Sequence, residues 1–261
     1  MGTTVSEIRE MLRLANAEEF AALERSLSAD ARKGVVSALA AARKRLAAEA
    51  AEDERLAGLY AFDRSFCTGD GDVVVGLDEV GRGAVAGPLA VGAVVLRGDR
   101  KIADLNDSKQ LSPEKREEVA AAVKEAALAW AVCYIEPEDI DRDGMSASLR
   151  KAFSGALAQI EASGVSVDVV LVDGNPLGID SRERNVIKGD SQSAAIAAAS
   201  VVAKVERDSL MRELSSAYPQ YGFSSNKGYA AAEHIDAIRA FGNSPVHRAT
   251  FCRSFMQESL F

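Results

Sequence analysis

The spacing of hydrophobic residues divides the chain into two parts. Residues 1 to about 66 contain no proline, are rich in Ala, Glu, Arg and Leu, and place apolar residues at helical intervals. We expect a first helix opened by Ser6 and a second helix from Val35 to Tyr60. Charges of alternating sign beside a narrow apolar stripe indicate a solvated surface that packs on the main domain or on a partner.

A polar, glycine-rich segment at residues 68–72 separates this part from a second pattern. Beyond it, short runs rich in Val and Ala are typical of buried strands, and they alternate with stretches of helical periodicity. The expected strands are 73–77, 89–96, 129–135 and 167–172, and the expected helices are 113–129, 146–162, 191–217 and 232–241. This order predicts an α/β domain with at least one βαβ unit over residues 71–261, preceded by a helical extension over residues 1–70.

Composition narrows the class of protein. Of the 261 residues, 48% are hydrophobic and 27% are charged, which is typical of a soluble globular protein. The sequence has no run of 18 apolar residues and no secretory signal, so we expect a cytoplasmic protein without membrane segments. Cys67, Cys133 and Cys252 lie far apart, which predicts reduced thiols and argues against a zinc site or a disulfide framework.

Two adjacent acids mark the first candidate site. Asp78 and Glu79 follow an apolar strand, and Gly81 and Gly83 come directly after them. Carboxylates that leave a buried strand are costly unless a cation or hydrogen-bond donors compensate them. Side chains on a strand alternate between its faces, so both acids reach one site only where the strand ends or bends, and the glycines permit a bend.

A dinucleotide-binding fingerprint is the rival interpretation of this segment, because residues 81–86 fit the pattern G-x-G-x-x-G/A. Two features oppose it. The acidic pair would lie beside a pyrophosphate, and the chain continues through Gly87-Pro88 into a strand instead of a phosphate-binding helix.

Two further acids also lie at the ends of elements. Asp173 ends an apolar strand and precedes Gly174-Asn175, whereas Asp190 precedes the helix expected from Ser191 and would equally suit its N-cap. Four acids at such ends, with no His or Cys beside them, predict an oxygen-ligand site for Mg²⁺ or Mn²⁺. Two such ions can flank a phosphodiester, one activating water and the other stabilising the leaving oxygen.

Aromatic and basic residues cluster between positions 218 and 229. Such a loop suits stacking on a base or sugar, although ordinary packing is favoured for Tyr218, Tyr221 and Phe223. Tyr229 differs, because it follows a Lys-Gly pair in a loop that we expect to be exposed.

Histidines and lysines supply the remaining candidates. We expect His234 to be packed and hydrogen-bonded on its helix, whereas His247 suits either support of the fold or contact with phosphate. The lysines that suit phosphate contact are Lys109, Lys188, Lys204 and Lys227. Lys204 has an alternative partner in Asp208, four residues along the same helix.

Taken in order, these segments resemble one known family. Asp78 to Pro88 closely resembles the opening motif of bacterial ribonuclease HII. The likeness continues through Asp107-Ser108-Lys109, Val172-Asp173-Gly174-Asn175, Ile187-Lys188-Gly189-Asp190, the stretch from Ile196 to Asp208, Lys227-Gly228-Tyr229, and His247 to Phe251. It covers about residues 72–252, and the related ribonuclease HIII fits less well because it typically lacks the Gly-Arg-Gly triplet.

The resemblance implies a ribonuclease H-like fold, in which helices flank a mixed central sheet. It also implies a catalytic site at which two Mn²⁺ or Mg²⁺ ions are bound by Asp78, Glu79, Asp173 and Asp190.

Substrate contacts are implied by the same resemblance. In the family, the backbone of Gly81-Arg82-Gly83 contacts the 2′-OH of the target nucleotide, and glycine leaves room for that hydroxyl. The tyrosine that matches Tyr229 contacts the junction between a ribonucleotide and the DNA that follows. Lys109 and Lys188 are further candidates for substrate binding.

The chain departs from the family pattern at two places. Ala230-Ala231 stands where Gly-Thr usually follows the junction tyrosine, so a phosphate contact from threonine is missing. Gln110 replaces a common second lysine, which removes one charge from a phosphate contact.

The implied activity is metal-dependent endonucleolytic cleavage of the RNA strand of RNA–DNA hybrids, and cleavage 5′ of ribonucleotides embedded in duplex DNA, leaving 3′-OH and 5′-phosphate ends. We expect a monomer, with the N-terminal helices available to a protein partner. A non-catalytic hybrid-binding protein is one alternative, which retention of all four acids opposes. A DNA-directed nuclease or transposase is another, which Gly81-Arg82-Gly83 and Tyr229 oppose.

The distribution of charge agrees with an acidic site. The net charge of −8 argues against coating nucleic acid by bulk charge. Residues 71–181 alone contribute −8 and contain three of the four candidate ligands, whereas residues 182–261 contribute +2. The sequence therefore predicts metal-dependent, shape-specific binding instead of a broad basic surface.

Overall fold

The structure is a computed structural model that describes residues 3–98 and 100–256. The chain forms two compact units, and the division between them falls between Ala57 and Gly58. Helix α3 (Lys33–Arg64) crosses this division, so its last two turns belong to the second unit.

The first unit contains α1 (Val5–Leu14), α2 (Ala17–Ser26) and most of α3. Each of the two short helices begins with a capping box, in which the cap side chain and a glutamate three residues later satisfy each other's backbone amides. The first box starts at Thr4, so the prediction that Ser6 opens the helix was wrong by two residues. The second box, at Asn16, starts a helix that the sequence pattern did not separate from its neighbours.

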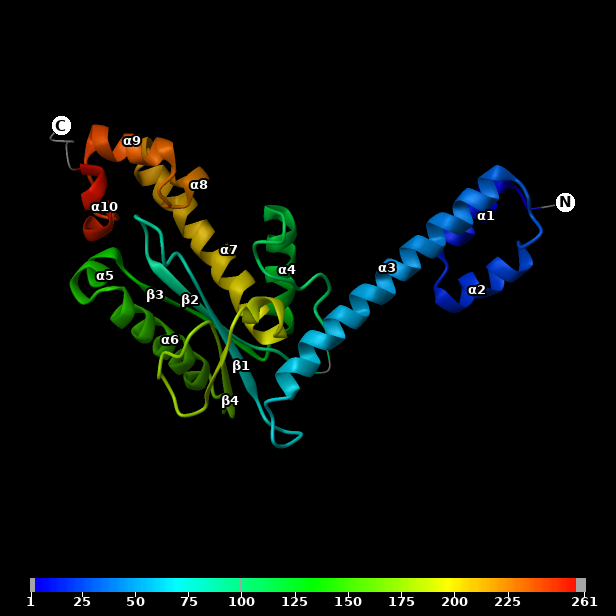
Figure 1. The fold of residues 1–261 in the computed structure, drawn as a ribbon, viewed down its shortest axis with the longest axis horizontal. Coiled ribbons are helices and arrows are strands. Elements are labelled where there is room, and N and C mark those ends of the chain that lie inside the picture. The colour runs from blue at the N-terminus through cyan, green and yellow to red at the C-terminus, as the bar shows by residue number, and fades with distance from the viewer. Residues whose placement is uncertain (1–2, 99, 257–261) are drawn as a thin grey trace. The chain divides into compact units, whose positions relative to one another are not determined.

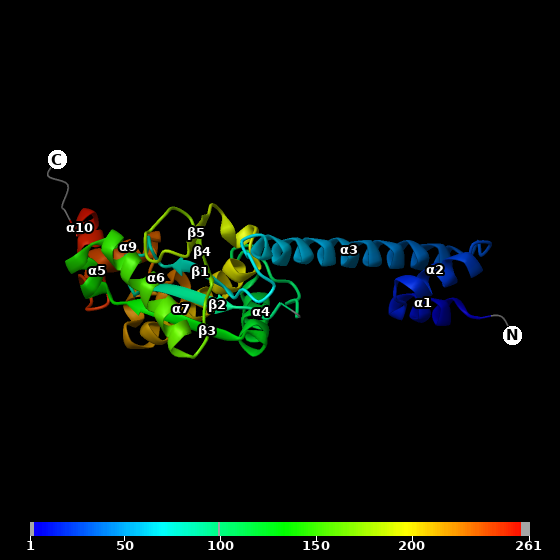
Figure 2. The ribbon, with the colours of Figure 1, turned by 90° about the horizontal axis from the view of Figure 1, so that it is seen from below.

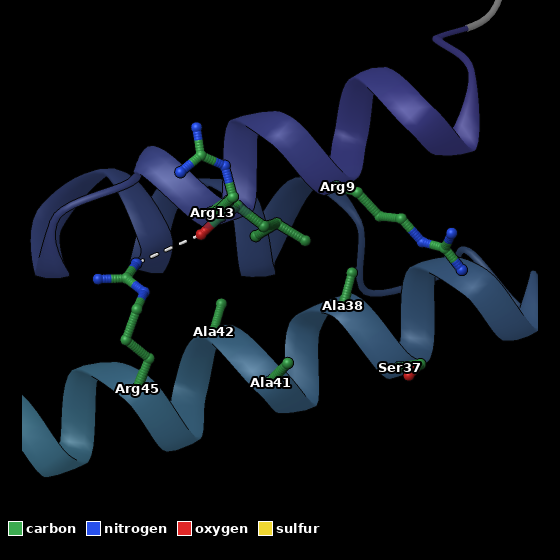
Figure 3. A pocket seen from close by; sticks show the side chains of 8 residues that line it. Arg9, Arg13, Ser37, Ala38, Ala41, Ala42 and Arg45 are labelled. Carbon is green, nitrogen blue, oxygen red and sulfur yellow. Dashed lines mark hydrogen bonds between the residues drawn. The ribbon is translucent and has the colours of Figure 1, made fainter.

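Helices α1 and α3 pack together and leave a hollow between them, which Arg9 and Arg13 border on the α1 side (Figure 3). The hollow has a volume of about 370 Å³, and its α3 side presents Ala38, Ala41 and Ala42. Arg45 reaches from α3 to the last turn of α1, where its guanidinium donates to the carbonyl of Ala15 at 2.6 Å. This contact ties the two helices together, because it satisfies a carbonyl that follows the end of α1.

The second unit is built on a mixed five-stranded sheet in the order β3-β2-β1-β4-β5. β1 pairs antiparallel with β2 and parallel with β4, while β3 and β5 extend the sheet on either side. The strands are β1 (Val74–Val80), β2 (Leu89–Val95), β3 (Ala129–Ile135), β4 (Val169–Asp173) and β5 (Glu183–Val186). The predicted α/β class with a mixed sheet is therefore confirmed, and β5 was missed because its short sequence is polar.

Helices cover both faces of this sheet (Figures 1 and 2). α6 packs on the face formed by residues such as Val75 and Leu77, whereas α7 packs on the opposite face against Gly76. The helices are α4 (Pro113–Ala126), α5 (Pro137–Asp143), α6 (Met145–Ala162), α7 (Ala194–Ala217), α8 (Phe223–Asn226), α9 (Ala232–Phe241) and α10 (Ala249–Met256). Two 3₁₀ turns, η1 (Gly189–Ser191) and η2 (Pro219–Tyr221), flank α7.

Two glycines allow α7 to lie directly on the sheet. A Cβ at Gly76 would be 2.1 Å from the backbone carbon of Ala195, and one at Gly92 would be 2.5 Å from the carbonyl oxygen of Ala199. The facing side of α7 is a run of buried alanines, so backbone approaches backbone with no large side chain between them. This contact fixes the position of α7 relative to β1 and β2.

The predicted start of α7 needs a correction. The side chain of Ser193 caps the helix by accepting from the amide of Ile196, so Asp190 is not the N-cap. Asp190 lies instead in η1, where it is free to face the end of the sheet.

The described residues also bear on two predictions from composition. None of their helices is long and apolar enough to cross a membrane. Cys67, Cys133 and Cys252 are free thiols, as predicted.

Candidate active site

Strand register places two of the candidate acids side by side. β1 and β4 run parallel with Leu77 opposite Val172, and the next residue on each strand is an aspartate, Asp78 and Asp173. Carboxyl ends of neighbouring parallel strands share one edge of a sheet. Residues 95 positions apart in the sequence therefore meet at this edge.

The adjacent acids on β1 point to opposite faces of the sheet. Asp78 lines an opening on the α7 side with Ser200, whereas Glu79 lines both that opening and a second one on the α6 side with Asp173. The two openings have volumes of about 310 and 330 Å³. Successive residues of a strand point to opposite faces, so Asp78 and Glu79 can border one site only at the end of the strand, which is where they lie.

Asp78 is the most buried acid of the site, with 6% of its surface exposed. Burial raises its pKa to about 8, and the charges of Glu79, Asp173 and Asp190 add to that rise. A hydrogen bond from the Ser200 hydroxyl opposes the rise. A cation close to Asp78 would stabilise its charged form.

Asp173 and Asp190 are linked through the turn that precedes α7. The Oδ1 atom of Asp173 accepts the backbone amide of Gly189 at 2.6 Å, and Asp190 follows directly in the chain. A Cβ at Gly189 would be 2.5 Å from the Ile196 side chain, so glycine allows this turn to pack against the helix. Burial and then the charge of Asp107 raise the pKa of Asp190.

The four acids Asp78, Glu79, Asp173 and Asp190 are called the carboxylate site below. No three or more His, Cys, Asp and Glu side chains among the described residues enclose a single point at metal-binding distances. The donor set nevertheless fits Mg²⁺ or Mn²⁺, because it consists of hard carboxylate oxygens whose mutual repulsion calls for a cation.

The two lysines proposed as substrate contacts occupy different positions. Lys109 Nζ lies 3.4 Å from Asp190 Oδ2 and 3.9 Å from Asp107 Oδ1. Burial lowers its pKa, but the two aspartate charges outweigh that effect and the net shift is upward. Lys188 is exposed two residues before Asp190, with a left-handed backbone (φ 56°). Lys109 therefore borders the carboxylate site, while Lys188 lies on the turn beside it.

Lys204 has the partner that its helical spacing suggested. Its Nζ atom forms an ion pair with Asp208 at 2.7 Å, four residues along α7. It also lines the opening at Asp78.

The Gly-Arg-Gly segment is shaped by the residues beneath it. Gly81 has a φ of 84°, and a Cβ there would be 2.2 Å from Nε of Arg207. Gly83 is exposed, and a Cβ there would meet no atom within 4 Å. Arg82 is exposed between them and lies 3.6 Å from Glu79. The first glycine is thus required by packing, whereas the second leaves a free space above the backbone.

Two fully buried arginines support this segment, and we call Arg207 and Arg248 the arginine pair. Both guanidinium groups donate to backbone carbonyls. Arg207 donates to those of Pro88, Lys227 and Ala86. Arg248 donates to those of Gly87 and Arg82. Burial and then the charge of Arg207 lower the pKa of Arg248 to about 9, which leaves it charged at neutral pH. The pair fixes the backbone from residue 82 to residue 88 relative to α7 and to the loop at residue 227.

Tyr229 lies in that loop and is 38% exposed, as the sequence predicted. Its ring lies 5.7 Å from the guanidinium carbon of Arg207 and borders the same opening as Asp78 and Gly83. Each carbonyl of the 227–229 loop accepts a hydrogen bond. Arg207 donates to Lys227, the amides of residues 85 and 86 donate to Gly228, and His234 donates to Tyr229. The loop therefore presents Tyr229 from a fixed backbone.

The other predictions for this region are tested by burial. Tyr221 (3% exposed) and Phe223 (0%) are packed, as favoured. His234 is buried and hydrogen-bonded, also as predicted, and His247 is buried beside it, which resolves the choice in favour of support of the fold.

The arginine pair and Ser200 were missed as functional residues by the sequence reasoning. Ser200 and Arg207 are buried polar residues seven apart on α7, which places them on one face of the helix, and Ser200 stands among buried alanines and valines. Polar residues on such a buried face are the signal that could have identified them.

Comparisons with known proteins identify the family of this chain. The ribonuclease HII family matches residues 75–254, and its N-terminal domain matches residues 4–67. Ribonuclease HII of Clostridium acetobutylicum is 41% identical over 212 residues, covering 78% of this chain and 81% of that protein. Ribonuclease HII of Ruminiclostridium cellulolyticum is 40% identical over 207 residues, covering 79% and 80%.

Solved structures share the fold. The crystal structure of ribonuclease H2 from Pyrococcus horikoshii superposes with a TM-score of 0.60 at 26% identity, covering 70% of this chain and 97% of that one. Bst-RNase HIII in complex with Mn²⁺ gives a TM-score of 0.59 at 21% identity, covering 71% and 69%, which shows the fold alone. From its sequence, strand order and relatives, this chain belongs to the ribonuclease HII family, whose members are hydrolytic endonucleases of the ribonuclease H class.

Proposed function

We propose that this enzyme cuts the RNA strand of RNA–DNA hybrids, and cuts 5′ of ribonucleotides embedded in duplex DNA, leaving 3′-OH and 5′-phosphate ends. The observation that carries this proposal is that Asp78 and Asp173 meet at one edge of the sheet, where the turn at Gly189 joins Asp190 to Asp173. Side chains that repel one another at an open site are suited to binding cations together with a phosphodiester.

Two Mn²⁺ or Mg²⁺ ions are the cofactors that suit these ligands, and Mn²⁺ is the ion in the Bst-RNase HIII complex. Bound there, they would activate a water molecule and stabilise the leaving oxygen. Asp78, Glu79, Asp173 and Asp190 are the residues that would hold these ions. Ser108 and Ser200 hydrogen-bond each other at 3.0 Å beside Asp78 and hold the buried side of the site in place.

The substrate surface runs from the carboxylate site to Tyr229. The free space above Gly83 suits a 2′-OH that approaches the backbone of residues 81–83. Tyr229 borders the same opening and suits stacking at the junction between a ribonucleotide and the following DNA. Arg82, Lys109 and Lys188 are exposed cations near this path and suit contact with phosphates.

We also infer that residues 71–261 form the catalytic domain and that residues 1–70 are an extension available to a protein partner. The separate matches of residues 4–67 and 75–254 support this boundary. We expect the enzyme to act in the cytoplasm as a monomer.

One assay tests the proposed chemistry. End-labelled duplexes that contain none, one or four ribonucleotides are incubated with the enzyme and Mn²⁺, and the cut is mapped together with its end groups. We expect cuts only where ribonucleotides are present, with 5′-phosphate and 3′-OH products. Cleavage of the all-DNA duplex, or 2′,3′-cyclic phosphate ends, would contradict the proposal.

The site assignment is tested with Asp173→Asn, which keeps the size of the side chain but removes its charge. We expect this variant to fold and to lose cleavage in both Mn²⁺ and Mg²⁺. Asp236→Asn is the matched control, because Asp236 is an exposed aspartate on α9. Full activity of Asp173→Asn would exclude Asp173 from the site.

A further inference from the structure

Two buried histidines lie behind the 227–229 loop, and we call His234 and His247 the histidine pair. They are 0% and 4% exposed, and their Nε2 atoms are 3.0 Å apart. The rings of Tyr221 and Phe223 pack against them, with centroids 4.6 Å from His247 and 5.3 Å from His234. A direct hydrogen bond between two imidazoles requires one ring nitrogen to donate and the other to accept.

The environment of His247 fixes the role of its ring. The backbone amide of Ser244 donates to Nδ1 at 3.0 Å, and the Ser244 hydroxyl lies 2.8 Å from the same nitrogen. An amide can only donate, so Nδ1 is unprotonated and the proton of the neutral ring is on Nε2. His247 therefore donates to His234.

The environment of His234 leads independently to the same direction. Its Nδ1 atom lies 2.8 Å from the carbonyl oxygen of Tyr229, which can only accept. The proton of His234 is therefore on Nδ1, and its Nε2 is left to accept from His247. Burial lowers the pKa of both rings, in agreement with two neutral imidazoles.

We propose that the histidine pair positions Tyr229, through a one-directional hydrogen-bond chain from Ser244 through His247 and His234 to the Tyr229 carbonyl. The proposal rests on the role of Tyr229 at the ribonucleotide–DNA junction. His234 and His247 are positioning residues for junction specificity, because they hold the backbone of the tyrosine and leave its ring free for the substrate.

The geometry explains why a second donor is needed at this carbonyl. The Tyr229 oxygen also accepts the amide of Ala231 at 2.8 Å, which closes a tight local turn. That contact is within the loop and moves with it. The bond from His234 connects the loop to α9 and, through His247, to the segment that precedes α10.

Nitrogen NMR of the full-length enzyme tests the chain directly, because the sequence contains only two histidines. At neutral pH we expect one Nδ1–H ring, His234, and one Nε2–H ring, His247, assigned with single-histidine variants. Two rings of the same tautomer, or a charged ring, would overturn the proposed direction.

Two substitutions at one position separate positioning from mere packing. His234→Asn places an amide N–H near the position of Nδ1 and keeps the donor to Tyr229. His234→Gln places its amide near Nε2, where it keeps contact with His247 but loses the donor to Tyr229. Both remove the same aromatic ring, so His234→Asn is the control for His234→Gln.

The readout is the ratio of kcat/KM for a duplex with one ribonucleotide to kcat/KM for a continuous RNA–DNA hybrid, which offers no junction near the cut. We expect His234→Gln to lower this ratio about tenfold, mainly through KM, and His234→Asn to leave it near the wild-type value. Tyr229→Ala is the reference for complete loss of the junction contact.

The outcomes are distinguishable. Equal losses on both substrates in the two His234 variants would show a purely structural role and overturn the inference. A wild-type ratio in His234→Gln, with a lowered ratio in Tyr229→Ala, would overturn the inference while the proposed function stands. Failure of the wild-type enzyme to cut either duplex would overturn both.

Discussion

Two regions border the segment from Asp78 to Pro88, and both bury charged or ionisable groups. The carboxylate site lies at the start of the segment. The arginine pair and the histidine pair support the rest of it and the 227–229 loop. In the first region, burial and then the charges of the neighbouring acids raise the pKa of Asp78. In the second, Arg207, Arg248 and the histidine pair have hydrogen-bond partners in the backbone or in one another. The carboxylate oxygens of the first region are suited to binding a ligand, whereas the arginine and histidine side chains of the second region donate hydrogen bonds that hold the backbone in place.

This contrast separates function from stability. A carboxylate buried among other acids costs free energy in the folded protein, so removal of its charge is expected to harm activity without harming the fold. A satisfied buried guanidinium behaves in the opposite way, because its loss leaves several carbonyls without donors. Substitutions in the carboxylate site should therefore lower activity and leave stability intact, whereas substitutions of the buried arginines should lower stability.

The largest effect is expected from Asp78→Asn. We expect cleavage to fall at least about a thousandfold, because the substitution removes the central charge of the site. The free energy of unfolding should stay the same or rise, since the variant relieves repulsion among the acids. Single-turnover cleavage and urea unfolding measure the two quantities, and a clear loss of stability would contradict the contrast.

In the second region, Arg248→Met should destabilise the protein by about 3 kcal/mol, because the carbonyls of Arg82 and Gly87 lose buried donors. Arg248→Lys should recover only part of this loss, since an ammonium cannot reproduce the guanidinium fork. Urea unfolding measures the change, and Arg253→Met on the exposed side of α10 is the control. A loss of activity with unchanged stability would refute this prediction.

The histidine pair makes stability depend on pH. Burial lowers the pKa of His247 to about 4, below its unfolded value near 6.5, so the folded state resists protonation. The contribution of neutral His247 to the free energy of unfolding is complete above pH 6.5. It is lost as the pH falls from 6.5 toward 4, and the total loss is up to about 3 kcal/mol. We expect the stability difference between the wild type and His247→Asn to shrink over this range in urea unfolding at fixed ionic strength. A difference independent of pH would contradict it.

The smallest effect is expected at the border of the carboxylate site, where Lys109 is a mostly exposed cation 3.4 Å from Asp190. Lys109→Gln removes a charge that competes with a divalent cation, so half-maximal activity should require about two- to fivefold less Mn²⁺. Metal titration of the cleavage rate measures this shift. Lys151→Gln, at an exposed lysine on α6, is the control, and a higher metal requirement in Lys109→Gln would give the lysine a different role.

The same contrast explains how much the sequence could predict. Asp78, Asp173 and Asp190 were recognised because polar residues interrupt apolar strands or precede a helix, and such interruptions are visible in a linear pattern. Asp78 and Asp173 lie close together because β1 and β4 pair in parallel. The strands and long helices were predicted for the same reason, within a few residues of their ends.

Other features depend on tertiary contacts and left little local signal. Ser6 was expected to open the first helix, but Thr4 supplies the cap because Glu7 is placed to complete the box. Arg248 lies in a loop whose sequence does not show that it will be buried. The tautomers of the histidine pair depend on Ser244 and Tyr229, which the fold brings together from different segments.

Helix α7 connects the two regions and sets the distance between them. Ser200, beside Asp78, and Arg207, beneath Gly81 and Lys227, lie seven residues apart, or about 10 Å along the helix axis. In the proposed function, the helix is thus a spacer of constant length between the carboxylate site and the loop that carries Tyr229. Because Gly76 and Gly92 let the helix pack directly on the sheet, the offset between the proposed cut and the proposed junction contact follows from the helical rise. An insertion or deletion between Ser200 and Arg207 would change this offset and would also rotate Arg207 by about 100° per residue, away from the carbonyls that it supports.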